Sequence, residues 1–187
     1  MDDPFAELTS GDDERAENAI PSIVKMGAAA IPPLMELARS DNLDWRWWAV
    51  RALAASPQAR TSDLVLYLED SNAEVRAAAA LGLSDHPGED ALPALVRTLS
   101  DSDPLTAGLA ANALVKLGKP SVESLIEAAK EGDLKIRILA LRALAELKDH
   151  RAIPVMMKCI QEDSAVLGYW AQKGLERLGL DMVYIKP

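Results

Sequence analysis

The chain has 187 residues and a formal net charge of −9; 49% of its residues are hydrophobic, but only 4% are aromatic. A single cysteine, Cys159, excludes a disulfide framework and a zinc finger, and no apolar run reaches the roughly 18 residues that a transmembrane helix needs. The N-terminus has no apolar signal region, so we expect a cytoplasmic protein without membrane partners.

The acidic residues are concentrated at the N-terminus. Residues 1–14 hold six acidic side chains and no basic one, which leaves −3 for the remaining residues. We expect residues 1–14 to form a peripheral acidic segment with at most one short docked turn, anchored by Phe5 and Leu8. The nearly balanced remainder does not attract phosphate backbones, so no nucleic-acid partner is expected.

Small residues recur in a fixed frame about every 30 residues. With Arg76 as position zero, Ala79 lies at +3, Gly82 at +6 and Leu83 at +7. The +6 residues are separated by 30 or 31 residues along the chain, which indicates an internal repeat. The other frames begin at Ala16 (a degenerate copy), Arg46, Ala107, Arg137 and Gly168.

Each frame follows a second amphipathic stretch, so each repeat is predicted to be a helical hairpin. Acid-rich turns such as DSN at 70–72 provide N-caps, and Pro32, Pro93 and Pro154 lie in opening turns, where proline is tolerated. Pro21 is expected to interrupt the first helix. In chain order, the pattern predicts helices over 13–26, 28–39, 43–55, 61–69, 72–84, 89–100, 103–117, 120–131, 133–147, 151–162 and 164–178.

The combination of Val-Arg at 75–76, Ala79 and a following Leu-Pro at 92–93 resembles the short HEAT repeat, which is also found in phycobilisome-lyase-like proteins. The resemblance covers roughly residues 15–180. It implies an all-α fold, a right-handed, armadillo-like α-solenoid of about five to six HEAT-like helical hairpins, followed by a C-terminal tail at 181–187.

The sequence contains no enzyme signature. His86 and His150 lie in separate turns without the His-Glu pairs of HEAT-like di-iron proteins, so no metal site is expected, and Cys159 is expected to be a semi-exposed, inert thiol. No cofactor is expected, and the chain is predicted not to be an enzyme. Arg46, Arg76 and Arg137 recur at position zero and are predicted to form ion pairs between repeats.

The candidate binding surface is the face of the second helix of each hairpin, which lines the concave side in HEAT arrays. Aromatic pairs occur there in the same register in two frames, and the charged members of the set are basic. An alternative is that the aromatic pairs cap the two ends of the array. The candidate partner-binding residues are Trp47, Trp48, Arg51, Leu81, Asn112, Ile138, Arg142, Tyr169, Trp170 and Lys173.

Three functions follow, in order of preference. The first is a non-catalytic scaffold that binds an acidic or aromatic segment of a protein partner through the concave face, with Trp47 and Tyr169 as anchors roughly 30–40 Å apart. The second is an accessory or lyase-like subunit of an enzyme or tetrapyrrole-handling complex, which the resemblance implies. The third is a HEAT-like DNA glycosylase, which the acidic composition disfavours.

Overall fold

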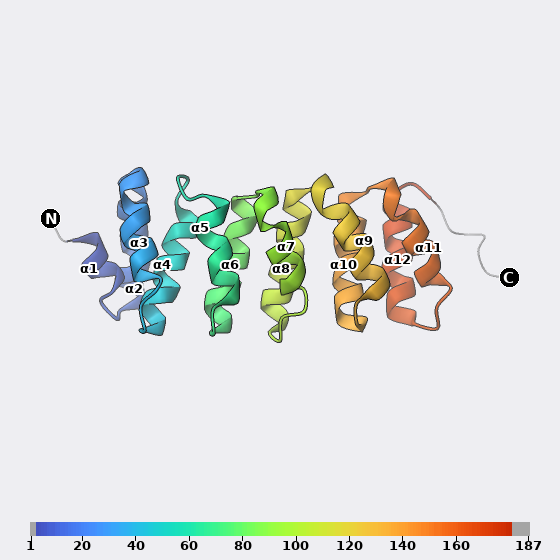
Figure 1. Ribbon diagram of the computed structural model, residues 1–187, viewed down its shortest axis with the longest axis horizontal. Coiled ribbons are helices and arrows are strands. Elements are labelled where there is room, and N and C mark those ends of the chain that lie inside the picture. Colours follow the sequence, from blue (N-terminus) through green and yellow to red (C-terminus); the bar gives the residue numbers. More distant parts are fainter. Residues whose placement is uncertain (1–2, 181–187) are drawn as a thin grey trace. The chain divides into compact units, whose positions relative to one another are not determined.

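The computed structural model describes residues 3–180, and these form helices joined by tight turns without any β-strand (Figure 1). The all-helical repeat fold expected from the sequence is therefore confirmed. The chain divides into two compact units, Met1–Ala94 (unit 1) and Leu95–Pro187 (unit 2). Residues 181–187, expected to form a tail, lie outside the described residues.

Unit 1 begins with a short helix and one longer helix, and two helical hairpins follow them, shown in blue to green in Figure 1. Helix α3 packs against α4, α5 packs against α6, and α4 contacts both α2 and α6. The elements are α1 (Pro4–Leu8), α2 (Asp13–Lys25), η1 (Gly27–Ala30), α3 (Ile31–Leu37), α4 (Leu43–Ala55), α5 (Thr61–Val65), η2 (Leu66–Glu69), α6 (Ala73–Asp85) and η3 (Glu89–Ala91), and α7 (Leu92–Thr98) crosses into unit 2.

Unit 2 repeats the arrangement. Helix α9 packs against α10, α11 packs against α12, and α10 contacts both α8 and α12. Four of the predicted single helices begin with a 3-10 turn, which is a common way for a short helix to start. The further elements are α8 (Pro104–Leu117), η4 (Lys119–Ser121), α9 (Val122–Glu131), α10 (Leu134–Leu147), η5 (His150–Ala152), α11 (Ile153–Ile160) and α12 (Ala165–Arg177).

Side-chain caps start the second helix of the hairpins before α12, as the turn composition predicts, whereas Ser164 at the start of α12 makes no side-chain cap. The Asn42 side chain accepts a hydrogen bond from the backbone N–H of Trp45 at 3.2 Å, and the Asp133 side chain accepts one from Ile136 at 2.9 Å. Each such bond satisfies a backbone donor that a helix start leaves without an intrahelical partner. Asp12, Asn72 and Asp103 cap α2, α6 and α8 in the same way.

The small residues of the repeat frame lie where helices touch. Ala79 and Ala110 are completely buried, as predicted, and so are the equivalent Ala49, Ala140 and Ala171. A methyl group is the largest side chain that such close helix contacts accept, because added volume in a packed core forces neighbours to move. The leucines at +7 are also buried and fill the layer beneath them.

One expectation about the N-terminus is wrong. Helix α2 continues through Pro21, which lies on the exposed side of the helix, so water can replace the hydrogen bond that proline cannot donate. The segment before α2 contains the five-residue helix α1, which packs against α2 and buries Leu8 completely. This agrees with the single short docked turn expected there.

Candidate functional site

The predicted binding residues of unit 1 have separate roles. Trp48 is only 7% exposed, so most of its side chain belongs to the core and little of it is available to a partner. The Arg51 guanidinium is paired with the Glu17 carboxylate at 2.9 Å, so its charge is already compensated. Trp47 is half-buried and Leu81 is 52% exposed, and both remain accessible to a ligand.

The Trp47 and Trp48 rings meet edge to face, with centroids 4.6 Å apart and an interplanar angle of 82°. They line a pocket of about 380 Å³, which lies within the usual range for ligand sites. Acidic side chains from the first turns of α2, α4 and α6 complete the lining. The pocket is formed by Asp13, Leu43, Asp44, Trp47, Trp48 and Glu74, and we call it the Trp47 pocket.

In unit 2 the predicted residues converge on one aromatic cluster. The Arg142 guanidinium lies over the Trp170 ring, 5.3 Å from its centroid, and Tyr169 meets Trp170 edge to face at 5.2 Å. Within the described part of the chain, no carboxylate forms an ion pair with Arg142. We call Arg142, Tyr169 and Trp170 the Arg142 platform.

The other predicted residues of unit 2 surround this platform. Lys173 forms a loose ion pair with Glu176 at 3.6 Å, which at this exposure contributes little to stability. Asn112 is exposed on α8 and Ile138 is half-buried on α10. The basic face expected from the sequence therefore reduces to one unpaired guanidinium, that of Arg142.

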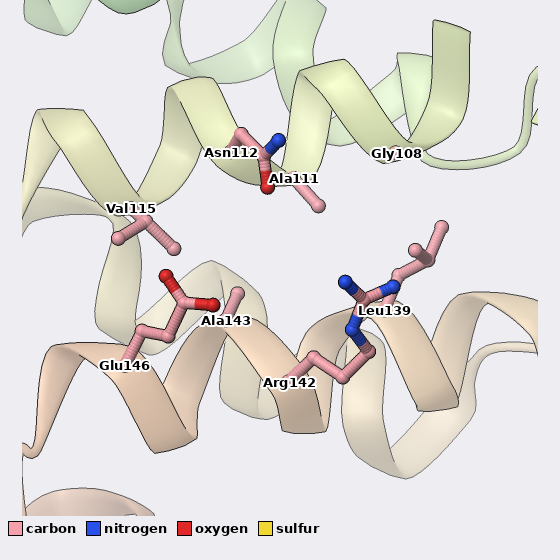
Figure 2. Close-up of a pocket in the computed structure, with 8 residues that line it drawn as sticks. All are labelled: Gly108, Ala111, Asn112, Val115, Leu139, Arg142, Ala143 and Glu146. Atoms are coloured by element: carbon pink, nitrogen blue, oxygen red, sulfur yellow. The ribbon is translucent and has the colours of Figure 1, made fainter. Parts of the chain in front are cut away.

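A narrow slot separates α8 from α10 beside the platform. Figure 2 shows Asn112 and Val115 on one side, and Arg142 and Glu146 rising from α10 on the other. Its volume of about 10 Å³ holds no more than a single water molecule. The slot is therefore too small for any ligand larger than water, and only the surface of the Arg142 platform is accessible.

The repeat arginines are structural, as predicted. The Arg46 guanidinium bonds to the Asp70 carboxylate at 3.0 Å, and that of Arg137 bonds to Glu162 at 2.7 Å. Each pair joins the start of one second helix to the turn of the next repeat. Cys159 is 1% exposed and 3.4 Å from Arg137 Nη2, so the expectation of a semi-exposed thiol is wrong.

His86 makes a hydrogen-bond contact with a neighbouring helix, which a solvated turn residue would not make. Its Nε2 lies 2.9 Å from the carbonyl oxygen of Ala54. Among residues 3–180, no three histidine, cysteine or acidic side chains lie close enough together to hold a metal ion. No helix within this range is long and apolar enough to cross a membrane.

Sequence reasoning missed the carboxylates of the Trp47 pocket. Asp13 was assigned to the acidic N-terminal segment, and Asp44 and Glu74 were not singled out. Their shared signal is an acidic residue in the first turn of three successive second helices. Helix dipoles alone favour acids there, so the pattern becomes informative only once the three helices are seen side by side.

The two units also differ in total charge. Residues 1–94 carry 17 acidic and 7 basic side chains, a net charge of −10, whereas residues 95–187 carry 12 and 13, a net charge of +1. The acidic character of the chain therefore resides in unit 1. The aromatic pair of unit 1 faces carboxylates, whereas that of unit 2 faces a guanidinium, so the charges beside the two pairs are opposite.

The repeats match known protein families. The HEAT repeats family matches residues 61–133, and the PBS lyase HEAT-like repeat family matches residues 136–162. The complex of CpcE and CpcF of phycocyanin lyase from Nostoc sp. PCC7120 has the same fold, with a TM-score of 0.56 and 21% identity over 94% of this chain and 76% of that one.

Three curated relatives are similar in sequence. The uncharacterized phycocyanin operon protein Z of Pseudanabaena tenuis (strain PCC 7409) is 30% identical over 74% of this chain and 73% of its own length. A phycobilisome maturation protein of Synechococcus elongatus is 32% identical over 48% of this chain, and the bilin biosynthesis protein RpcF of Synechococcus sp. (strain WH8020) is 30% identical over 49%. The chain spans less than half the length of these last two relatives, 42% and 44%.

These comparisons correct one expectation from the sequence. The prediction that the chain is not an enzyme is wrong, because its relatives include a protein named as a bilin biosynthesis protein. Enzymatic activity is difficult to predict from solenoid repeats, because their sequence pattern reflects helix packing and contains no local catalytic motif. The chain belongs to the HEAT-repeat family whose members carry the PBS lyase HEAT-like repeat.

Proposed function

We propose that this chain is a lyase-type subunit that handles an open-chain tetrapyrrole (a bilin) in the cytoplasm, together with a protein partner. The names of its relatives support this role, since two of them refer to phycobilisome maturation and bilin biosynthesis. The structural neighbour from Nostoc is a complex of two subunits, which supports a protein partner.

The observation that carries the proposal is the Arg142 platform. A bilin is a flat conjugated molecule with two propionate carboxylates, so it suits a site with aromatic rings and an unpaired cation. Tyr169 is 58% exposed and Trp170 is half-buried, which leaves ring surface for stacking. Arg142 is held over Trp170 at 5.3 Å without a carboxylate partner, so its N–H groups remain available to a propionate.

The role of these residues is to bind and orient. A guanidinium that is stacked on an aromatic ring has lost part of its side-chain freedom before the ligand arrives, which lowers the entropic cost of binding. Lys173 follows Tyr169 by one turn of α12 and its pair with Glu176 is loose, so it provides a second cation for the other propionate. Holding a reactant in one orientation is itself a large contribution to catalysis.

The proposal is tested by titrating the full-length chain with phycocyanobilin and recording visible absorbance and circular dichroism. We expect a shifted absorbance band and an induced dichroic signal, and a dissociation constant at least ten times larger for Arg142→Gln. Arg177→Gln is the matched control, because Arg177 is exposed on the same helix as Trp170 and forms no ion pair in the described structure. The dimethyl ester of the bilin, which has no propionate charge, should bind equally to wild type and Arg142→Gln.

The absence of any spectral change on adding the bilin to wild type would overturn the proposed function. Equal losses of affinity for Arg142→Gln and Arg177→Gln would instead exclude the Arg142 platform as the site. Both variants change exposed side chains, so their thermal unfolding is expected to match wild type.

A further inference from the structure

The Trp47 pocket in unit 1 lies outside the function proposed above, and its chemistry is different. Three carboxylates, those of Asp13, Asp44 and Glu74, surround the two indole rings of Trp47 and Trp48. We infer that this pocket binds an arginine or lysine side chain from a basic segment of a protein partner.

The carboxylates of the pocket have no partner within the described residues. Among residues 3–180, no side-chain hydrogen bond or ion pair involves Asp13, Asp44 or Glu74, and all three are exposed. Both basic residues of α4 are already used, because Arg46 binds Asp70 and Arg51 binds Glu17. The negative charge of the pocket is therefore compensated by nothing that the structure describes.

Helix capping does not account for this group. The backbone N–H groups at the starts of α2, α4 and α6 are bonded by Asp12, Asn42 and Asn72. The dipoles of the three helices stabilise acidic residues in their first turns, but that effect is equally available on any side of each helix. Their position around one aromatic pair is a property of the packed unit.

Trp48 adds a second indole ring and a hydrogen-bond donor to the pocket. Its side chain lines the pocket and is 93% buried, and its indole N–H donates to no acceptor in the part of the chain that the structure describes. The indole nitrogen itself remains in contact with solvent, because it is not among the buried polar atoms that lack a partner. A backbone carbonyl oxygen of a peptide ligand can accept a hydrogen bond from it, which an isolated cation cannot do.

The pocket suits an extended organic cation better than a metal ion. No three acidic side chains in residues 3–180 lie close enough to share a metal, whereas a guanidinium carries five N–H donors on a planar fork. The faces of Trp47 and Trp48 provide cation–π attraction. Leu43 lines the same pocket and offers an apolar surface for the aliphatic stem of arginine or lysine.

The charge of unit 1 points in the same direction. With 17 acidic and 7 basic side chains, residues 1–94 attract a basic segment from a distance and repel an acidic one. The expectation from the sequence, an acidic partner segment anchored at Trp47, is therefore replaced at this end of the chain by a basic one.

The test uses the full-length chain and a short, acetylated and amidated peptide in which glycine and arginine alternate. Its control ligand is the same peptide with citrulline in place of arginine, which keeps the shape and removes the charge. Binding is followed by calorimetry and by tryptophan fluorescence at low salt. We expect saturable binding of the arginine peptide with a change in tryptophan emission, and at least tenfold weaker binding of the citrulline peptide.

Two variants with equal charge locate the site. In the first, Asp13→Asn, Asp44→Asn and Glu74→Gln neutralise the pocket; in the second, Asp85→Asn, Glu89→Gln and Asp90→Asn neutralise three exposed acids near the other end of α6. We expect at least a tenfold loss of affinity for the pocket variant and less than a threefold loss for the control. A third variant, Trp47→Leu, should weaken binding while preserving the net charge.

Equal losses for the two charge variants would overturn the inference, because the peptide would then bind to the overall charge of unit 1. Equal binding of the arginine and citrulline peptides would also overturn it, since the pocket would not recognise a cation. No tetrapyrrole is present in this test, so its outcome is independent of the proposed function.

Discussion

The two aromatic pairs of the chain occupy the same register of the repeat, but their surroundings differ. Trp47–Trp48 and Tyr169–Trp170 both meet edge to face, at interplanar angles of 82° and 80°. In unit 1 the second ring is buried and carboxylates surround the pair, whereas in unit 2 the second ring is half-buried beneath Arg142. The repeat determines where an aromatic pair lies, and the residues of the adjacent helices determine which charge it meets.

The largest expected effect is a difference in stability between substitutions of Trp48 and Trp170, the second ring of each aromatic pair. Trp48→Ala should lower the free energy of unfolding by about 3–5 kcal/mol, because it removes a buried indole and leaves a cavity. Trp170→Ala should cost less than half as much, since Trp170 is only half-buried. Urea unfolding followed by far-UV circular dichroism measures both, and equal losses would support the end-cap interpretation of Tyr169–Trp170.

The next largest effect is a difference in stability between substitutions at the two ends of the described residues. Leu8→Ala should cost about 2–5 kcal/mol, because Leu8 is fully buried at the start of unit 1. Leu180→Ala is the matched change at the other end, where the side chain is 40% exposed, and should stay within about 0.5 kcal/mol of wild type. A Leu8→Ala protein as stable as wild type would show that Leu8 does not anchor the acidic segment, which would then be peripheral as the sequence predicts.

A smaller effect distinguishes two glycines at the same +6 position. A Cβ at Gly82 would lie 2.6 Å from the Cβ of Ala54, which cannot move without its helix, so Gly82→Ala should cost about 1–3 kcal/mol. A Cβ at Gly174 would instead meet the flexible end of Met156, at 2.5 Å from its Cε. Gly174→Ala should therefore lie within about 1 kcal/mol of wild type, because alanine also favours the helix. Thermal unfolding of the two variants tests this difference, and the reverse order would contradict it.

The smallest effect is a pH dependence in the turns. A hydrogen bond from the Arg151 side chain lowers the pKa of Asp149 to about 2, so its contribution to stability is complete above the ordinary value of about 3.9. This contribution is lost as the pH falls from about 4 towards 2, and it should stay below about 1 kcal/mol because Arg151 is exposed. Urea unfolding at several pH values should show the difference between wild type and Asp149→Asn disappearing over this range.

The Asp63 turn provides the comparison in unit 1. Burial alone would raise the pKa of Asp63, but hydrogen bonds from Arg60 outweigh it and lower the pKa. Asp63→Asn should therefore also lose its effect in acid. Because the Asp63 side chain is only 3% exposed, its substitution should cost more at neutral pH than that of Asp149. An Asp63→Asn variant that matches Asp149→Asn at every pH would contradict this account.

The sequence by itself determined the repeat architecture of this protein. The predicted helix over 43–55 coincides with α4, and the alanines of the frame are buried as expected. Both could be predicted because helix periodicity and close packing require apolar and small residues at fixed spacings along the sequence. The arginines at position zero were also assigned correctly from their recurrence. Only the tertiary structure decided which of the predicted binding residues are available, since Trp48 and Arg51 became core and ion-pair residues through contacts with other helices. It alone also brought Asp13, Asp44 and Glu74 together around Trp47, because side chains from three repeats meet only after their helices have packed.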